Sequence, residues 1–361
     1  MGFDTQVRSY DAIVVGAGAA GGLASLLLTE SNLRVLCLDA GWRPPLWSAP
    51  YRHAVAALTP KLADIGQTAN LHPQISLIGQ RALKAFGRVR QPVQSKFFAW
   101  MFAPDAFVDD RDFPYSVAPG SRFEWFRTHQ TGGRMFVPGH GRQYYRLDDD
   151  AFAAHWPFDA KELGPWYEAV EERLKLSGDN HAPTEAEQET LARLGALWPD
   201  ANPVLGNSAP PLDSIALAQA TGLLDHRGGA SVSNVDIDAS GRVQGVQWTD
   251  RATGDRQSAR APIVFLCASA LESTRILLSS SAPTTGAAPG APSGALGRYL
   301  MDHITVSAGG EGPPLPTEEP ANPGRCVFLS RTDEDEIAGR SRYGMQVYRW
   351  SIGARSSRFT G

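Results

Sequence analysis

The chain has 361 residues, of which 42% are hydrophobic and 20% are charged, and its formal net charge is −4. This length predicts two domains or one large domain, and the composition is that of an ordinary globular protein. The slight negative charge excludes the basic surface on which nucleic-acid binding depends, so we expect no nucleic-acid partner.

One apolar run near the N-terminus has the length of a signal or membrane segment. Residues 12–28 carry no charge, but four glycines interrupt them. Asp4, Arg8 and Asp11 precede the run, so the basic region that opens a signal peptide is lacking. We therefore expect no membrane span.

Three cysteines, Cys37, Cys267 and Cys326, lie far apart in the sequence and form no CxxC pair. Cys37 and Cys267 stand inside apolar runs, which predicts buried core thiols. No cluster has metal-ligand spacing, so we expect no metal site. The cysteine usage favours a reducing, cytoplasmic location.

Residues 10–41 have the pattern of a dinucleotide-binding unit. An apolar, β-branched run at 12–15 predicts a buried parallel strand, and a Leu- and Ala-rich run at 23–28 predicts a helix. A second buried strand is expected at 34–38, and Asp39 follows it. Between the first strand and the helix stand glycines in G-x-G-x-x-G spacing, at Gly16, Gly18 and Gly21.

Each of these residues has a physical task in such a unit. Gly16 permits a tight turn, Gly18 lets the backbone approach a pyrophosphate, and Gly21 lets helix and strand pack closely. The N-terminus of the helix then offers free N–H groups to the phosphates. Asp39 can accept hydrogen bonds from ribose hydroxyls, and its charge disfavours the 2′-phosphate of NADP. The alternative is a glycine-rich turn that binds nothing.

The remaining elements predict an α/β fold, in which a Rossmann-like parallel sheet is accompanied by a β-meander. An incomplete second domain of mixed sheet and helices completes this prediction. An amphipathic helix is expected from Pro165 to Gly178, and a proline-rich loop at 201–212. The other expected elements are helices at 185–197, 214–221 and 271–280, an antiparallel meander over 229–260 and a buried strand at 262–268.

Several of these stretches, taken in order, resemble the GMC (glucose–methanol–choline) family of FAD-dependent oxidoreductases. The resemblance extends over roughly residues 8–305. The matching segments are YDAIVVGAGAAGG (10–22), DAG (39–41), TGGRMFVPGHGRQYYRL (131–147), WPFDAKELGPWYEAVEERLKLSG (156–178), ASVSNV (230–235), IVFLCASALESTRILLSS (263–280) and LGRYLMDH (296–303).

The resemblance implies FAD as cofactor and assigns residues to it. The glycine loop would hold the pyrophosphate, Asp39 the adenosine ribose, and the segment 131–141 would lie along the isoalloxazine ring. Ser269 stands where the family commonly has glycine. The implied cofactor-binding residues are Gly16, Gly18, Ala19, Ala20, Gly21, Asp39, Ala40, Gly132, Gly133, Arg134, His140, Val232, Ala268 and Ser269.

His140 has three possible roles. Some members of the family attach flavin covalently through a histidine in this segment. The alternatives are a hydrogen-bonded loop histidine and a polar contact to substrate. The segment 135–140 also departs from the family's pattern, because it lacks a tryptophan found there in many members.

The resemblance implies a discontinuous FAD-binding domain at 8–45 and 221–305. It further implies a cap and flavin-covering segment at 46–220 and the start of a substrate domain at 306–361. The family's catalytic histidine belongs to a C-terminal part that we do not find here, since no histidine follows His303. We therefore expect an incomplete chain that contains no catalytic residue and has impaired activity.

The implied function is oxidation of the CH–OH group of a sugar or other alcohol, by hydride transfer to flavin N5. The expected partners are a small alcohol or sugar and an electron acceptor, which is oxygen, a quinone or a cytochrome. Two alternatives remain open: a nicotinamide-dependent dehydrogenase and a catalytically silent flavin-binding protein.

Overall fold

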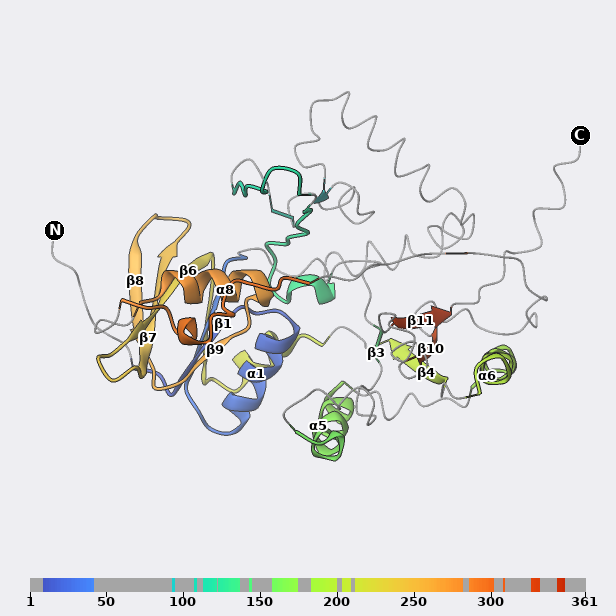
Figure 1. Cartoon of the computed structure of the whole chain (residues 1–361). Helices are drawn as coiled ribbons and strands as arrows, with labels where there is room; N and C mark the ends of the chain where they lie inside the picture. Colours follow the sequence, from blue (N-terminus) through green and yellow to red (C-terminus); the bar gives the residue numbers. More distant parts are fainter. Residues whose placement is uncertain are drawn as a thin grey trace, which may run out of the picture. The chain divides into compact units, whose positions relative to one another are not determined.

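The computed structural model (Figure 1) describes about half of the chain in two compact units. The glycine-rich unit draws on residues before 141 and on 213–306, and the second unit is formed mainly from 141–212 and 307–361. The described residues are 9–41, 93–94, 107–108, 113–121, 123–136, 143–144, 158–174, 183–199, 203–208, 212–281, 286–301, 308, 326–331 and 343–347. The domain boundaries expected from the sequence stay a prediction.

A four-stranded parallel sheet forms the centre of the first unit, with the order β5-β2-β1-β9. Its strands are β1 (Ala12–Val15), β2 (Val35–Asp39), β5 (Leu224–Gly228) and β9 (Val264–Leu266). β1 lies between β2 and β9, with Val14 opposite both Cys37 and Phe265. The sheet confirms the expected Rossmann-like architecture.

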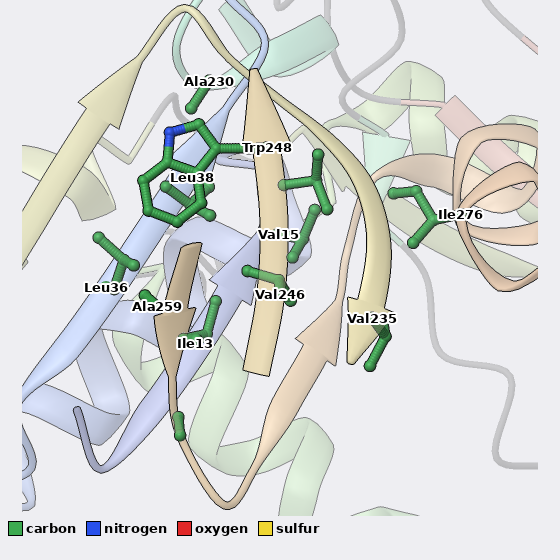
Figure 2. Close-up of a cluster of buried hydrophobic side chains, with 12 residues drawn as sticks. Ile13, Val15, Leu36, Leu38, Ala230, Val235, Val246, Trp248, Ala259 and Ile276 are labelled. Atoms are coloured by element: carbon green, nitrogen blue, oxygen red, sulfur yellow. The ribbon is translucent and has the colours of Figure 1, made fainter. Parts of the chain in front are cut away.

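The sheet is covered on both faces, which explains its uninterrupted apolar strands. On one face, Ile13, Val15, Leu36 and Leu38 pack into a core with the meander (Figure 2). On the other face, the alternate residues Val14, Val35 and Cys37 pack with Ile215. Cys37 is fully buried, as expected, and Cys267 is half-buried.

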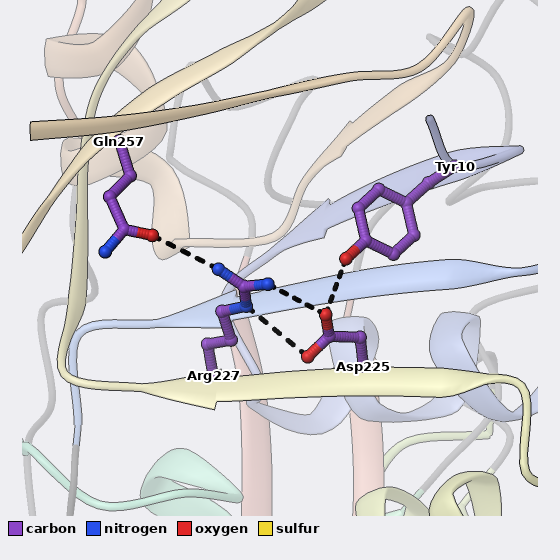
Figure 3. Close-up of polar contacts among 4 residues, drawn as sticks. All are labelled: Tyr10, Asp225, Arg227 and Gln257. Carbon is purple, nitrogen blue, oxygen red and sulfur yellow. Dashed lines mark hydrogen bonds and ion pairs between the residues drawn. The ribbon is translucent and has the colours of Figure 1, made fainter. Parts of the chain in front are cut away.

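β5 is a parallel strand that the sequence analysis did not predict. It pairs with β2 at the edge of the sheet, so it tolerates the polar sequence LDHRG. Asp225 accepts a hydrogen bond from the Tyr10 hydroxyl and forms an ion pair with Arg227 at 3.0 Å (Figure 3). Arg227 also donates to Gln257 on β8 (Arg256–Arg260), which ties the edge strand to the meander.

The meander is a three-stranded antiparallel sheet in the order β6-β7-β8, as expected. Its strands are β6 (Ala230–Ile237), β7 (Val243–Asp250) and β8 (Arg256–Arg260). Val246 and Trp248 on β7 are buried against the parallel sheet. Burial of side chains of this size contributes about 1.5–3 kcal/mol each.

Among the described residues of the first unit, three helices flank these sheets: α1 (Ala19–Glu30), α7 (Ser214–Ala220) and α8 (Ser269–Ser279). α1 connects β1 to β2 and packs against α7, where Gly22 lies close to Ser214. α8 follows β9 and packs against β6. The described part of this unit also contains the 3-10 turns η4 (Gly133–Phe136) and η5 (Ala291–Ser293).

In the second unit, the residues that the structure describes form a four-stranded sheet, β11-β10-β4-β3, and two helices. The strands are β3 (Gln143–Tyr144), β4 (Val204–Ser208), β10 (Cys326–Arg331) and β11 (Tyr343–Val347). The helices are α5 (Ala160–Arg173) and α6 (Glu185–Leu197), and α6 has the bounds that the sequence predicted. Val327 and Leu329 of β10 pack with Leu194 of α6 in its core.

Two expectations for this unit were wrong. α5 begins at Ala160 instead of near Pro165, because Asp159 and Glu162 form a capping box that fixes the N-terminus earlier. Pro165 lies inside the helix, which ends before Leu174 and not at Gly178. The stretch 201–212 is not all loop, since β4 pairs there with β10. Among the described residues, no helix is long and apolar enough to cross a membrane.

Candidate functional site

The N-terminus of α1 is an uncapped helix end at the carboxyl edge of the parallel sheet. Gly18 is the N-cap residue, so no side chain bonds the first N–H groups. Ala19 and Ala20 are exposed in this first turn, and a Cβ added at Gly18 would have no neighbour within 4 Å. An open helix N-terminus with exposed N–H groups is suited to a phosphate group.

Gly16 and Gly21 are required by packing. Gly16 has a φ of +100°, and a Cβ there would lie 2.5 Å from the carbonyl oxygen of Cys267. A Cβ at Gly21 would lie 1.8 Å from the carbonyl oxygen of Gly16. These two glycines therefore let β1, α1 and the end of β9 approach one another, while Gly18 faces open space.

Asp39 links the glycine loop, residues 16–21, to the turn after β2. Its Oδ2 accepts a hydrogen bond from the backbone N–H of Ala17, and its Oδ1 accepts one from Gly41, each at 2.6 Å. Burial raises the pKa of this carboxyl, while the two N–H donors act in the opposite direction. Each oxygen keeps acceptor capacity beyond its one backbone bond, so a ribose hydroxyl can still bind.

A second glycine segment, residues 129–133, lies directly on the glycine loop. The Gly132 N–H donates to the carbonyl oxygen of Ala17 at 2.9 Å. A Cβ added at Gly133 would lie 3.2 Å from the Cα of Gly18, and Gly133 has a φ of +59°. Two glycine-rich stretches that are far apart in sequence thus lie in direct contact.

The residues on either side of Gly132 and Gly133 hold the second glycine segment in its turn. The Gln130 side chain is fully buried and donates to the Gly133 carbonyl at 2.9 Å. A Cβ at Gly132 would collide with the Phe136 ring, at 2.2 Å. Arg134 follows with an exposed side chain, which is free to reach a bound anion.

A junction beside Asp39 was missed by the sequence analysis. A Cβ at Gly41 would lie 2.7 Å from the Gln130 backbone nitrogen, so the turn after β2 touches the second glycine segment. Arg251 donates to the carbonyl oxygen of Ala40 at 3.0 Å and lies 3.0 Å from Nδ1 of His129. No motif marks Arg251, because its partners are distant in sequence.

The remaining predicted residues lie around β6 and the start of α8. Val232 is buried in the same core as Val15, and its carbonyl accepts a hydrogen bond from Arg275 at 2.8 Å. Ala268 is the N-cap of α8 and provides no side-chain cap, and Cys267 donates its N–H to the Val15 carbonyl at 2.8 Å. Ser269 has a φ of +68°, in the left-handed region that favours glycine.

His226 lies beside the Asp39 turn and carries a ring nitrogen that is unpartnered among the described residues. His226 on β5 pairs with Cys37 across the sheet, and the Asp39 carboxylate is among the charges that act on it. Within the part of the chain that the structure describes, the buried Nε2 of His226 has no hydrogen-bond partner. His140 lies outside the described residues. The described His, Cys, Asp and Glu side chains form no cluster that could hold a metal ion.

Comparisons with known proteins agree with this fold and connect it to oxidoreductases. A family model described as NAD(P)-binding Rossmann-like domain matches residues 14–76. A 2-methyl-1,2-propanediol dehydrogenase from Mycolicibacterium austroafricanum is 23% identical over 83% of the chain and 56% of its own length. A 6'''-hydroxyparomomycin C oxidase from Streptomyces lividus is 22% identical over 82% of the chain and 55% of its own length.

Among solved structures, pyridoxine 4-oxidase from Mesorbium loti matches with a TM-score of 0.43 and 17% identity. The match covers 75% of the chain and 52% of that structure. The chain spans about half the length of the curated relatives that it matches, the dehydrogenase and the oxidase named above.

Proposed function

We propose that this chain, like the oxidoreductases to which it is similar, is of the glucose–methanol–choline type, and that it binds FAD between its two glycine segments as part of an enzyme that oxidises a CH–OH group. The observation that carries the proposal is the contact between these segments at the uncapped N-terminus of α1. Open space at Gly18 and the nearby backbone of Gly133 leave a cradle of main-chain atoms, which suits a pyrophosphate.

Residues of the chain have separate tasks in this proposal. The N–H groups of Gly18, Ala19, Ala20 and Gly21 would hold the pyrophosphate, with Arg134 able to add a positive charge. The carboxylate of Asp39, already oriented by the Ala17 and Gly41 N–H groups, would accept ribose hydroxyls. The other residues assigned to FAD are Gly16, Ala40, Gly132, Gly133, His140, Val232, Ala268 and Ser269.

Bound FAD would supply hydride-accepting chemistry toward the carbon that bears the substrate hydroxyl. The chain's own part is to bind and orient the cofactor, because the described residues around the site offer backbone donors, the Asp39 carboxylate and the exposed Arg134 guanidinium. The substrate class is an alcohol or sugar, in line with the diol and hydroxylated compounds in the names of the relatives.

A second candidate, a nicotinamide-dependent dehydrogenase, is favoured by the description of the family model, which names NAD(P). The same glycine loop and Asp39 would serve NAD, so a measurement of cofactor binding is needed to distinguish the FAD-dependent from the nicotinamide-dependent candidate. A catalytically silent flavin-binding protein is the third candidate, and it differs from the first only in turnover.

The test is titration of the purified chain with FAD, followed by quenching of flavin fluorescence, and in parallel with NAD⁺. We expect saturable FAD binding and no saturable NAD⁺ binding at the same concentrations. Binding of NAD⁺ alone would refute the proposal in favour of the second candidate. Reduction of a redox dye by an alcohol panel with the FAD-loaded protein then separates an enzyme from a silent binder.

A further inference from the structure

Arg251 makes contacts with three separate parts of the nucleotide site. It lies in the turn between β7 and β8, and its NH1 donates to the Ala40 carbonyl oxygen at 3.0 Å. The same nitrogen lies 3.0 Å from Nδ1 of His129. The centre of its guanidinium stands 4.1 Å from the centroid of the Phe113 ring, in cation–π contact.

These partners belong to segments that are far apart in the sequence. Ala40 follows Asp39 in the turn after β2, whereas His129 opens the second glycine segment. Phe113 packs its ring edge-on against His129, with 5.2 Å between centroids. Three residues after His129, Gly132 donates to Ala17 in the glycine loop. Arg251 thus connects the turn after β2 to the second glycine segment, which contacts the glycine loop.

The turn that carries Arg251 is closed without its side chain. Asp250 Oδ1 accepts a hydrogen bond from the N–H of Ala252 at 2.8 Å. The Gly254 N–H donates to the Asp250 carbonyl at 2.7 Å, and the Arg251 backbone N–H donates to Gly229 at 2.9 Å. These backbone and Asp250 hydrogen bonds form the turn, while the guanidinium contacts Ala40, His129 and Phe113 in neighbouring segments.

The charge states of Arg251 and His129 determine which of them donates the hydrogen bond between the two side chains. Arg251 stays protonated, so it is a donor only. His129 has to be neutral to accept from it, and burial together with the nearby Arg251 and Arg127 lowers the pKa of His129 to about 3. At neutral pH, Arg251 is therefore the donor and His129 the acceptor of this hydrogen bond.

We propose that Arg251 is a positioning residue of the dinucleotide site, which holds the second glycine segment against the turn at Ala40 and so keeps Gly132 and Gly133 on the glycine loop. The inference rests on the proposed FAD binding, and it concerns a residue whose contacts described above are with other parts of the protein. Because Arg251 preorganises one wall of the site, its loss raises the cost of ordering that wall on binding.

The experiment compares Arg251→Met with the wild-type chain and with Arg256→Met, which removes an exposed arginine from β8. Amide hydrogen exchange is measured on the cofactor-free proteins, and the Kd for FAD by fluorescence quenching. In Arg251→Met we expect faster exchange over residues 129–133, unchanged exchange over β1, and a Kd about tenfold higher, as loss of one charge-assisted contact predicts. Arg256→Met should match the wild type in all three measurements.

Two milder variants keep the test decisive if Arg251→Met does not fold. Arg251→Lys retains a donor for Ala40 but loses the planar stack, and Phe113→Leu removes only the ring, so both should give smaller changes in the same direction. Unchanged exchange at 129–133, or an unchanged Kd beside faster exchange, would overturn the inference. A wild-type chain that binds no FAD overturns the proposed function instead, and the exchange data remain a separate test of the junction.

Discussion

The backbone N–H of Ala17 donates to the Asp39 carboxylate at 2.6 Å, which joins the glycine loop to the end of β2. Gly41 donates to the other oxygen of the same carboxylate. Asp39 therefore organises the loop before any ligand binds, and its expected contact with ribose would use its remaining lone pairs.

Replacement of Asp39 by Asn tests this double role. The amide can accept from one of the two N–H groups but presents its own donors to the other, so one buried N–H loses its acceptor. We expect the free energy of unfolding to fall by about 1–2 kcal/mol in urea titrations and FAD binding to weaken about tenfold or more. Asp255→Asn, in an exposed turn, is the matched control, and equal effects of the two changes would contradict the prediction.

Gly18 and Gly21 should respond differently to alanine. A Cβ at Gly21 would overlap the Gly16 carbonyl oxygen, so Gly21→Ala should destabilise the fold by about 1–3 kcal/mol or more. A Cβ at Gly18 meets no protein atom within 4 Å, so Gly18→Ala should cost about 1 kcal/mol or less. It should nevertheless weaken FAD binding, since the methyl group occupies the space expected for pyrophosphate. Thermal melts and FAD titrations separate the two effects, and normal FAD affinity in Gly18→Ala would count against the site.

Ser269 holds a left-handed backbone at the start of α8, with a φ of +68°. Glycine adopts this conformation without the Cβ clash, although it gains entropy in the unfolded chain. We expect Ser269→Gly to raise the free energy of unfolding by about 0.5 kcal/mol. Ala270→Gly, one residue further into the helix, should lower it by about 1 kcal/mol. The test is whether the two changes shift the free energy of unfolding, measured by urea denaturation, in opposite directions. Destabilisation by both changes would show that the contacts of Ser269 stabilise the fold by more than its backbone strain costs.

The lowered pKa of His129 predicts that the free energy of unfolding depends on pH. Its pKa is lowered from 6.5 to about 3, chiefly by burial, so the unfolded chain binds a proton at a pH where the folded chain does not. The contribution of neutral His129 to the free energy of unfolding is fully present above pH 6.5. It decreases as the pH falls toward 3, by at most about 1.4 kcal/mol for each pH unit.

The measurement is the free energy of unfolding at several pH values for the wild type and for His129→Gln, which keeps an acceptor for Arg251. The variant should lose less stability on acidification. The pKa of His226 is also lowered by burial, so some acid sensitivity should persist in the variant. Identical slopes for the two proteins would exclude a contribution from His129.

The sequence by itself determined the β1–α1–β2 unit, because every signal in it is local. Apolar runs of strand length, glycines at fixed spacing and a terminal acid lie within about thirty consecutive residues, in keeping with the size of such a unit. The helix at Glu185–Leu197 was also predicted with its observed bounds, since Thr184 and Glu187 form a capping box readable from the chain.

Only the tertiary structure decided which distant segments meet. Gly133 approaches Gly18, Arg251 joins His129 to Ala40, and β5 completes the parallel sheet, each through contacts between residues far apart in sequence. β5 escaped prediction because an edge strand buries less surface and can be polar, so it lacks the apolar run that marked β1 and β2. Periodicity and spacing report local conformation, whereas the hydrogen bond from Gly132 to Ala17 joins segments that are far apart in the sequence, which no local pattern reports.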